Sequence, residues 1–174
     1  KFTSFYDYKN LKGLHNLQNE TIAFEHSQNK TNIWGYHKGS YNYLFNEYAP
    51  FNVTVIVNQE PMVDKIFNNI EFTSDSWNNN TLINSTFDTL DAWNEYQEGH
   101  LSLVNIHNKP SALKKKFRMW RANIPRNNTN KCGDNTHNYK RDRMRNPWLY
   151  LKLSMNTPNT NKTVLHDIIV DYFV

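Results

Sequence analysis

The sequence predicts an all-β fold, made of mainly antiparallel, sandwich-like sheets with long polar loops and little helix. Apolar and polar side chains alternate in residues 51–58, and β-branched and aromatic side chains are enriched in residues 163–173, as is typical of strands. The 28 asparagines suit turns and tolerate left-handed backbone. The 25 aromatic residues (10 Phe, 10 Tyr and 5 Trp) indicate a folded core built largely from rings.

The expected strands follow one another along the chain with polar turns between them. They are residues 1–8, 20–26, 32–37, 51–58, 63–73, 101–106, 114–124, 148–155 and 163–173. Residues 86–97 are ambiguous, because Phe87, Leu90 and Trp93 recur every three residues as in a helix. The all-β surroundings favour a strand there. Residues 74–81 and 156–162 have the composition of turns, and Pro125 ends the strand before it.

The last strand is expected to lie at the centre of its sheet. Val164 and Ile168 fall on one of its faces and Leu165 and Ile169 on the other. Large apolar side chains on both faces predict a central strand rather than an edge strand. On the same grounds, His166 is predicted to be a hydrogen-bonded core residue.

The length of 174 residues predicts a single β-rich domain over residues 1–174, with a basic loop at residues 125–147. Because the first residue is Lys1 rather than Met, we expect the chain to be a fragment of a longer polypeptide. The one cysteine, Cys132, excludes an internal disulfide. No stretch has the apolar length of a transmembrane helix, so no membrane span is expected.

Charge is divided unevenly along the chain. Residues 1–110 hold 7 Lys/Arg and 12 Asp/Glu, a balance of −5, whereas residues 111–174 hold 13 and 4, a balance of +9. Such asymmetry is typical of a partner surface. The predicted interface consists of nine of the twelve cations and two tryptophans of residues 114–152: Lys114, Lys115, Lys116, Arg118, Trp120, Arg121, Arg126, Arg141, Arg143, Arg145 and Trp148.

This basic stretch fits more than one function. Cations interleaved with stacking rings are what single-stranded nucleic acid binding requires, so residues 114–152 are a candidate nucleic-acid site. A protein interface or a solvated surface fits the same residues, and no RNP, zinc-finger or helix-turn-helix pattern accompanies them. A third interpretation is carbohydrate binding through Trp34, Trp77 or Trp93 on an exposed face, against their burial in the core.

No catalytic or cofactor signature is visible in the sequence. Cys132, Asp134 and His137 lie within six residues, but a structural zinc site needs four ligands and no second cluster occurs. The HExxH, GxSxG and P-loop patterns are absent, and five glycines provide poorly for phosphate-binding loops. We therefore expect no enzyme, no metal and no cofactor.

Five stretches of the chain carry a resemblance to a phage protein family. They are KFTSFYDYKN, TFDTLDAWNEYQEG, KKKFRMWRANIPRN, RDRMRNPWLYLKLS and KTVLHDIIVDYF, in this order. Together they resemble the C-terminal part of the muzzle, or tail stabilisation, protein of crAss-like phages, which have short tails. None of the five is a catalytic signature, so the family supplies no catalytic residue to carry over.

The resemblance implies a structural virion protein located in the tail. It implies a subunit of the tail muzzle or nozzle, assembled with copies of itself as a symmetric ring around the DNA exit channel. Adjacent tail proteins would be its other partners, and contact with exiting DNA would be transient. The resemblance also makes the chain the C-terminal piece of a longer polypeptide.

Overall fold

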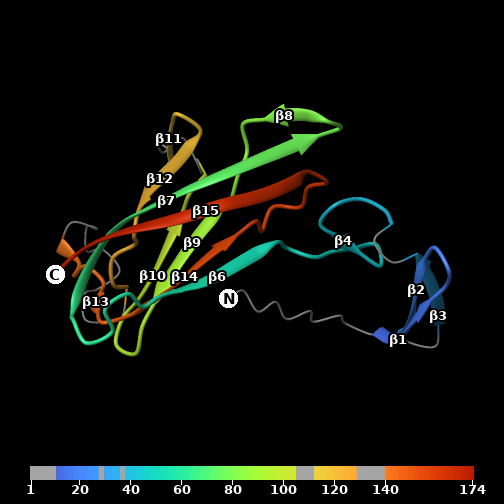
Figure 1. Ribbon diagram of the computed structural model, residues 1–174, viewed down its shortest axis with the longest axis horizontal. Coiled ribbons are helices and arrows are strands. Elements are labelled where there is room, and N and C mark those ends of the chain that lie inside the picture. The colour runs from blue at the N-terminus through green and yellow to red at the C-terminus, as the bar shows by residue number, and fades with distance from the viewer. Residues whose placement is uncertain (1–10, 28–29, 36–37, 105–111, 129–139) are drawn as a thin grey trace. The chain divides into compact units, whose positions relative to one another are not determined.

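The computed structural model describes residues 11–27, 30–35, 38–104, 112–128 and 140–174 (Figure 1). The strand expected at residues 1–8 and the group Cys132, Asp134 and His137 lie outside these residues. Strands make up 59% of the described residues and helix 1%, and the sheets are antiparallel, which confirms the all-β class. The chain forms two compact units, Lys1–Ala49 and Pro50–Val174, each described by itself below. The assignment of residues 1–174 to one domain stays a prediction.

The first unit contains a three-stranded antiparallel sheet in the order β1-β2-β3. Its strands are β1 (Leu11–Asn16), β2 (Thr21–Ser27) and β3 (Lys30–Gly35), followed by the short pair β4 (Tyr43–Leu44) and β5 (Glu47–Tyr48). Ala23 is fully buried, and Glu25 is nearly so. Oε2 of the Glu25 carboxylate accepts hydrogen bonds from Trp34 Nε1 (2.8 Å) and Asn32 Nδ2 (3.2 Å), which compensate for its burial.

The second unit contains a four-stranded antiparallel sheet in the order β10-β9-β14-β6 (Figure 1). Its strands are β6 (Asn52–Val57), β9 (Thr89–Trp93), β10 (Glu98–Ser102) and β14 (Leu149–Ser154). β9 falls within the ambiguous residues 86–97, so the strand interpretation is confirmed there. Leu149, Leu151 and Leu153 of β14 are buried, whereas Tyr150 and Lys152 between them face outward.

The second sheet of this unit is organised around the long strand β7 (Lys65–Asn78). Along one edge, β7 pairs with β15 from Trp77 opposite Lys162 to Ile66 opposite Phe173. The other edge pairs with three shorter strands in succession: β13 (Arg145–Asn146), β12 (Met119–Asn123) and β8 (Thr81–Ile83). β11 (Lys114–Lys116) pairs with β12 and completes the sheet, and β15 spans Lys162–Phe173.

The two sheets of the second unit share one hydrophobic core, as the predicted sandwich requires. Every strand that contributes to this core alternates buried and outward residues. The core residues are Phe67, Ile70, Phe72, Phe87, Leu90, Ala92, Leu103, Trp120, Ala122, Ile124, Met144, Leu149, Leu151, Leu153 and Met155. Leu165, Ile168, Val170 and Tyr172 of β15 are partly buried against them.

Three expectations about the strands and their residues were wrong. β15 is not a central strand: among the described residues it pairs with β7 alone, so its second edge is open. His166 sits at a register irregularity of β15 and is exposed rather than in the core, although it does form a hydrogen bond. Residues 114–124 are not one strand but the hairpin β11–β12, which turns at Phe117 and Arg118.

Gly99 in β10 lies where another part of the chain approaches closely. A Cβ atom there would lie 2.6 Å from the carbonyl oxygen of Arg126 and 2.7 Å from Met144 Cε. We expect Gly99→Ala to lower the free energy of unfolding by about 1–3 kcal/mol, because backbone must shift to relieve the contact. Urea unfolding measures this. Gly13→Ala is the control, since its Cβ would meet nothing within 4 Å; equal losses in both variants would contradict the steric argument.

Candidate interaction surfaces

The predicted interface residues fall into two groups in the structure. The first lies on the β11–β12 hairpin, and the second on the segments that lead to and include β13. The exposed members are Lys114, Lys115, Lys116, Arg118, Arg121, Arg143 and Arg145; Arg126, Arg141 and Trp148 are half-buried, and Trp120 is buried. Their role in an interface stays a prediction, which the following geometry sharpens.

The hairpin tip (residues 114–118) presents an aromatic ring among cations. Phe117 is 88% exposed, and Lys116 Nζ lies 5.4 Å from the centre of its ring. Both turn residues have positive φ, 49° at Phe117 and 69° at Arg118, as a two-residue hairpin turn of this hand requires. Asparagine and glycine adopt this backbone at low cost, whereas other side chains pay about 1–2 kcal/mol per residue. Such strain is typical of positions kept for function.

The two tryptophans of the predicted interface differ in burial: Trp120 is buried and Trp148 is half-buried. Trp120 is 7% exposed, and its indole N–H donates to the carbonyl of Ser74. Lys115 Nζ lies 4.4 Å from the centre of the Trp120 ring, so the lysine helps to cover it. Trp148 packs edge-on against Tyr150 with 5.1 Å between ring centres. Trp120 therefore supports the hairpin from the core and offers no face for stacking on a base.

The outward face of the β7 sheet carries ion pairs that fix the hairpin. Arg118 donates to Asp75 Oδ2 at 2.9 Å, and His166 of β15 lies 3.0 Å from the same oxygen. Burial alone would raise the pKa of Asp75, but the hydrogen bonds and positive charges of His166 and Arg118 outweigh burial. The pKa of Asp75 therefore lies below its ordinary value of 3.8.

The lowered pKa of Asp75 predicts how the stability of the fold changes in acid. Because the folded-state pKa of Asp75 is below its unfolded value, the carboxylate stabilises the fold above pH 3.8, and this contribution is lost as pH falls through the folded pKa. The difference in unfolding free energy between the native chain and Asp75→Asn should therefore shrink from pH 6 to pH 3. Urea titrations at both pH values measure it, with circular dichroism confirming folding; an equal difference at both would contradict the assignment.

The second group of cations binds neighbouring segments of the same chain. Arg126 Nη1 donates to the carbonyl oxygen of Arg141 (2.8 Å), and Arg143 Nη1 donates to Asn68 Oδ1 (3.2 Å). Arg141 donates to the side chain of Asn128. These bonds fasten the segments before β13 to β7 and to the end of the β12 strand region, so this group is less available to a partner than the hairpin tip.

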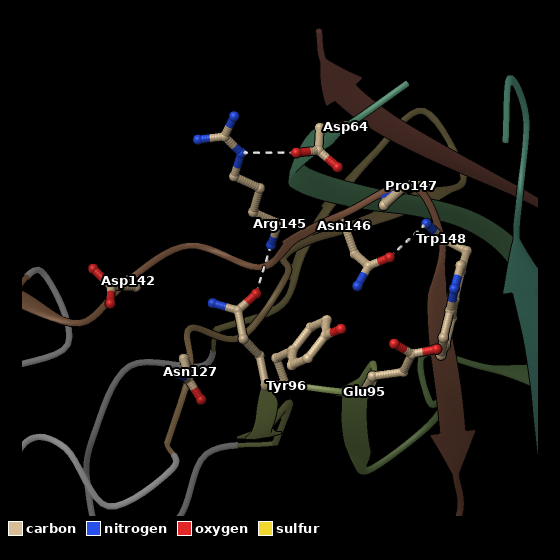
Figure 2. A pocket seen from close by; sticks show the side chains of 10 residues that line it. Asp64, Glu95, Tyr96, Asn127, Asp142, Arg145, Asn146, Pro147 and Trp148 are labelled. Atoms are coloured by element: carbon tan, nitrogen blue, oxygen red, sulfur yellow. Dashed lines mark hydrogen bonds and ion pairs between the residues drawn. The ribbon is translucent and has the colours of Figure 1, made fainter. Parts of the chain in front are cut away.

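A cavity of about 620 Å³ opens beside β13 (Figure 2). Four separate segments line this acidic pocket: Asp64, Glu95, Tyr96, Gln97, Asn127, Asp142, Arg145, Asn146, Pro147 and Trp148. Arg145 Nε lies 3.7 Å from Asp64 Oδ2, and the Arg145 backbone N–H donates to Gln97 Oε1 at 2.7 Å. Asn94 Oδ1 accepts from the backbone N–H groups of Tyr96 and Gln97, both at 2.9 Å, and so shapes the β9–β10 turn.

The acidic pocket was missed at the sequence level. Its three carboxylates, Asp64, Glu95 and Asp142, are far apart in the chain and follow no motif. Only the pairing of β13 with the start of β7 and the position of the β9–β10 turn bring them together. The exposed Phe117 was missed for a different reason, because its alternation with cations predicted a continuous strand. KKKFR contains none of the residues that favour turns (Gly, Pro, Asn, Asp or Ser), so the sequence carries no signal for this turn.

The geometry does not favour a carbohydrate platform at Trp93. Its ring is stacked on Tyr150 with 5.2 Å between centres and 15° between planes. One face of each ring is therefore covered by the other, which leaves at most one face of Trp93 for a sugar. Within the described ranges, no group of three His, Cys, Asp or Glu residues is placed to hold a metal ion. The same part of the chain has no helix long and apolar enough to cross a membrane.

Comparisons with known proteins agree with the resemblance to crAss-like phage muzzle proteins. Residues 39–127 match a family model described as the Crassvirus muzzle protein C-terminal domain. The chain is also 49% identical over 174 residues, 99% of its length, to the muzzle protein of Bacteroides phage crAss001, and it spans 12% of that relative's length. The expected resemblance is confirmed: the chain belongs to the Crassvirus muzzle protein C-terminal domain family.

Proposed function

We propose that this chain is a structural virion component and a subunit of the phage tail muzzle at the DNA exit channel. The observation that carries the proposal is the 49% identity to a phage muzzle protein across 99% of the chain. The role is architectural rather than catalytic. A rigid two-sheet core that holds a strained, exposed hairpin tip supports such a role, because subunit contacts need side chains fixed on stable strands.

In the proposed assembly, copies of the chain contact one another in a symmetric ring and contact adjacent tail proteins. The balance of −5 in residues 1–110 and +9 in residues 111–174 supports contacts between surfaces of opposite charge. Exiting DNA passes along the ring, and its contacts with exposed cations such as Lys114 and Arg143 are transient. Attraction between these cations and DNA phosphates would weaken with rising salt concentration.

Particles of the phage that encodes this chain provide the test. We expect mass spectrometry to find the chain in density-purified virions, and gold-labelled antibodies against it to bind the distal end of the tail. Absence of the chain from purified particles, while it is present in infected cells, would overturn the virion role. Labelling confined to the capsid would overturn the muzzle location.

A further inference from the structure

We propose that the hairpin tip of one copy docks into the acidic pocket of a second copy. This inference rests on the proposed function, because it names the surfaces through which copies of the chain meet. The occupant of the pocket is therefore the segment KKKFR of a neighbouring subunit, with Phe117 at its centre.

The hairpin tip has the properties of an inserted element. Phe117 is 88% exposed, and the ammonium of Lys116 lies 5.4 Å from the centre of its ring. Lys114 and Lys116 have no ion-pair partner among the described residues. The salt bridge from Arg118 to Asp75 at 2.9 Å holds the turn in place, so the tip is presented in one orientation.

The acidic pocket has the complementary chemistry. The lining contains three carboxylates, those of Asp64, Glu95 and Asp142, and one cation, Arg145. Its net charge is therefore −2. Glu95 and Asp142 have no ion-pair partner within the part of the chain that the structure describes. Figure 2 shows the Tyr96 ring among the other labelled side chains, with the Glu95 side chain directed toward Trp148. Two rings and two unpaired carboxylates match one ring flanked by ammonium groups.

The tip and the pocket of one copy lie too far apart to touch, so the tip of one copy must bind the pocket of another. Arg118 of the tip bonds Asp75 near one end of β7, whereas Arg145 of the pocket pairs with Ile66 at the other end. Nine residues of extended strand separate Ile66 from Asp75, a distance of about 30 Å. A tip cannot reach its own pocket across that distance. Contact between two different surfaces is heterologous, and repeating it by a rotation produces a ring.

A single tip in a single pocket is a small contact, so pairs of copies should associate weakly. When the last copy of a ring meets the first, the final contact forms within one assembly and gains from effective concentration. The proposal therefore predicts cooperative assembly that weakens with salt, since the complementary groups are charged and exposed.

The test uses two variants of the full 174-residue chain, each with one defective surface. The tip variant carries Lys116→Glu and Phe117→Ala, and the pocket variant carries Glu95→Lys and Asp142→Lys. Sedimentation velocity and native mass spectrometry should show that either variant alone needs at least tenfold higher concentration than the native chain to associate. A mixture of the two should form 1:1 dimers and nothing larger, because only one intact tip and one intact pocket remain.

Controls separate loss of contact from loss of fold. Lys152→Glu on the outward face of β14 reverses a charge outside both surfaces, and this variant should assemble like the native chain. Circular dichroism should show all variants folded. Self-association of either double variant at the native concentration would overturn the proposed contact, as would a native chain that stays monomeric at every concentration.

The outcome in particles distinguishes this inference from the proposed function. If phage carrying Lys116→Glu and Phe117→Ala incorporate the chain in native amount and with native tail structure, the contact is wrong and the virion role stands. If the native chain is absent from virions, the virion role is wrong, and the association measurements in solution still decide the contact.

Discussion

Lys65→Met is expected to lower the free energy of unfolding of the Pro50–Val174 unit by about 3–5 kcal/mol. Lys65 is fully buried at the start of β7. Its ammonium donates to the carbonyl oxygens of Glu60 (2.9 Å), Val63 (3.3 Å) and Pro147 (2.5 Å). Methionine fills a similar volume but donates no hydrogen bond, so three carbonyls lose their partner. Each unsatisfied buried group costs about 1–3 kcal/mol, partly offset by the easier burial of a thioether and by water that reaches the carbonyl of the exposed Glu60.

Urea unfolding followed by tryptophan fluorescence measures the Lys65 effect. The control is Lys152→Met on the outward face of β14, which is expected to change stability by less than about 0.5 kcal/mol. Lys65→Met should also loosen the acidic pocket, because Lys65 connects the loop before β7 to Pro147 of the pocket lining. Equal stability of the two methionine variants would show that the ammonium makes no net contribution.

Leu151→Ala is expected to destabilise the same unit by about 3–4 kcal/mol. Leu151 is fully buried in β14, which pairs with β9 on one side and β6 on the other. Truncation removes apolar contacts and leaves a cavity in the middle of the sandwich, where sheet pairing on both sides prevents collapse.

The matched control for Leu151 is Ile56→Ala in β6. Ile56 is 59% exposed on the outward face of the same sheet, so its truncation should cost less than about 1 kcal/mol. Midpoints of urea unfolding with unchanged slope give the comparison. Similar losses at the two positions would mean that the two sheets do not enclose the core at Leu151.

Local patterns predicted the fold class but not the pairing of strands. Alternation placed β6 and β14 within one or two residues of their observed bounds, and enrichment in β-branched and aromatic residues did the same for β15. It failed for β15 as a central strand, since Ile169 and Phe173 are apolar yet exposed, 49% and 57%. Period-two patterning indicates which face of a strand is buried. It does not indicate which strand pairs with it, because that depends on residues distant in the chain.

A candidate surface could be predicted from the sequence only where its charged residues are adjacent in the chain. The cations of residues 114–118 are consecutive in the sequence, so a basic surface was visible there. The burial of Trp120 was not, because the turn at Phe117 shifts which residues of the hairpin face the core. The acidic pocket depends on the meeting of four distant segments, which no window of sequence contains.

The position of β14 in its sheet also determines the order in which the strands can pair during synthesis. β14 lies between β9 and β6, so the four-stranded sheet stays split into separate parts until residues 149–154 have been synthesised. β15, later still, covers an edge of β7 along most of its length. Pairings this distant in sequence form slowly. On the ribosome, β6, β7 and β9 must therefore wait with unpaired edges, and chaperones that shield such edges would raise the yield of native chain.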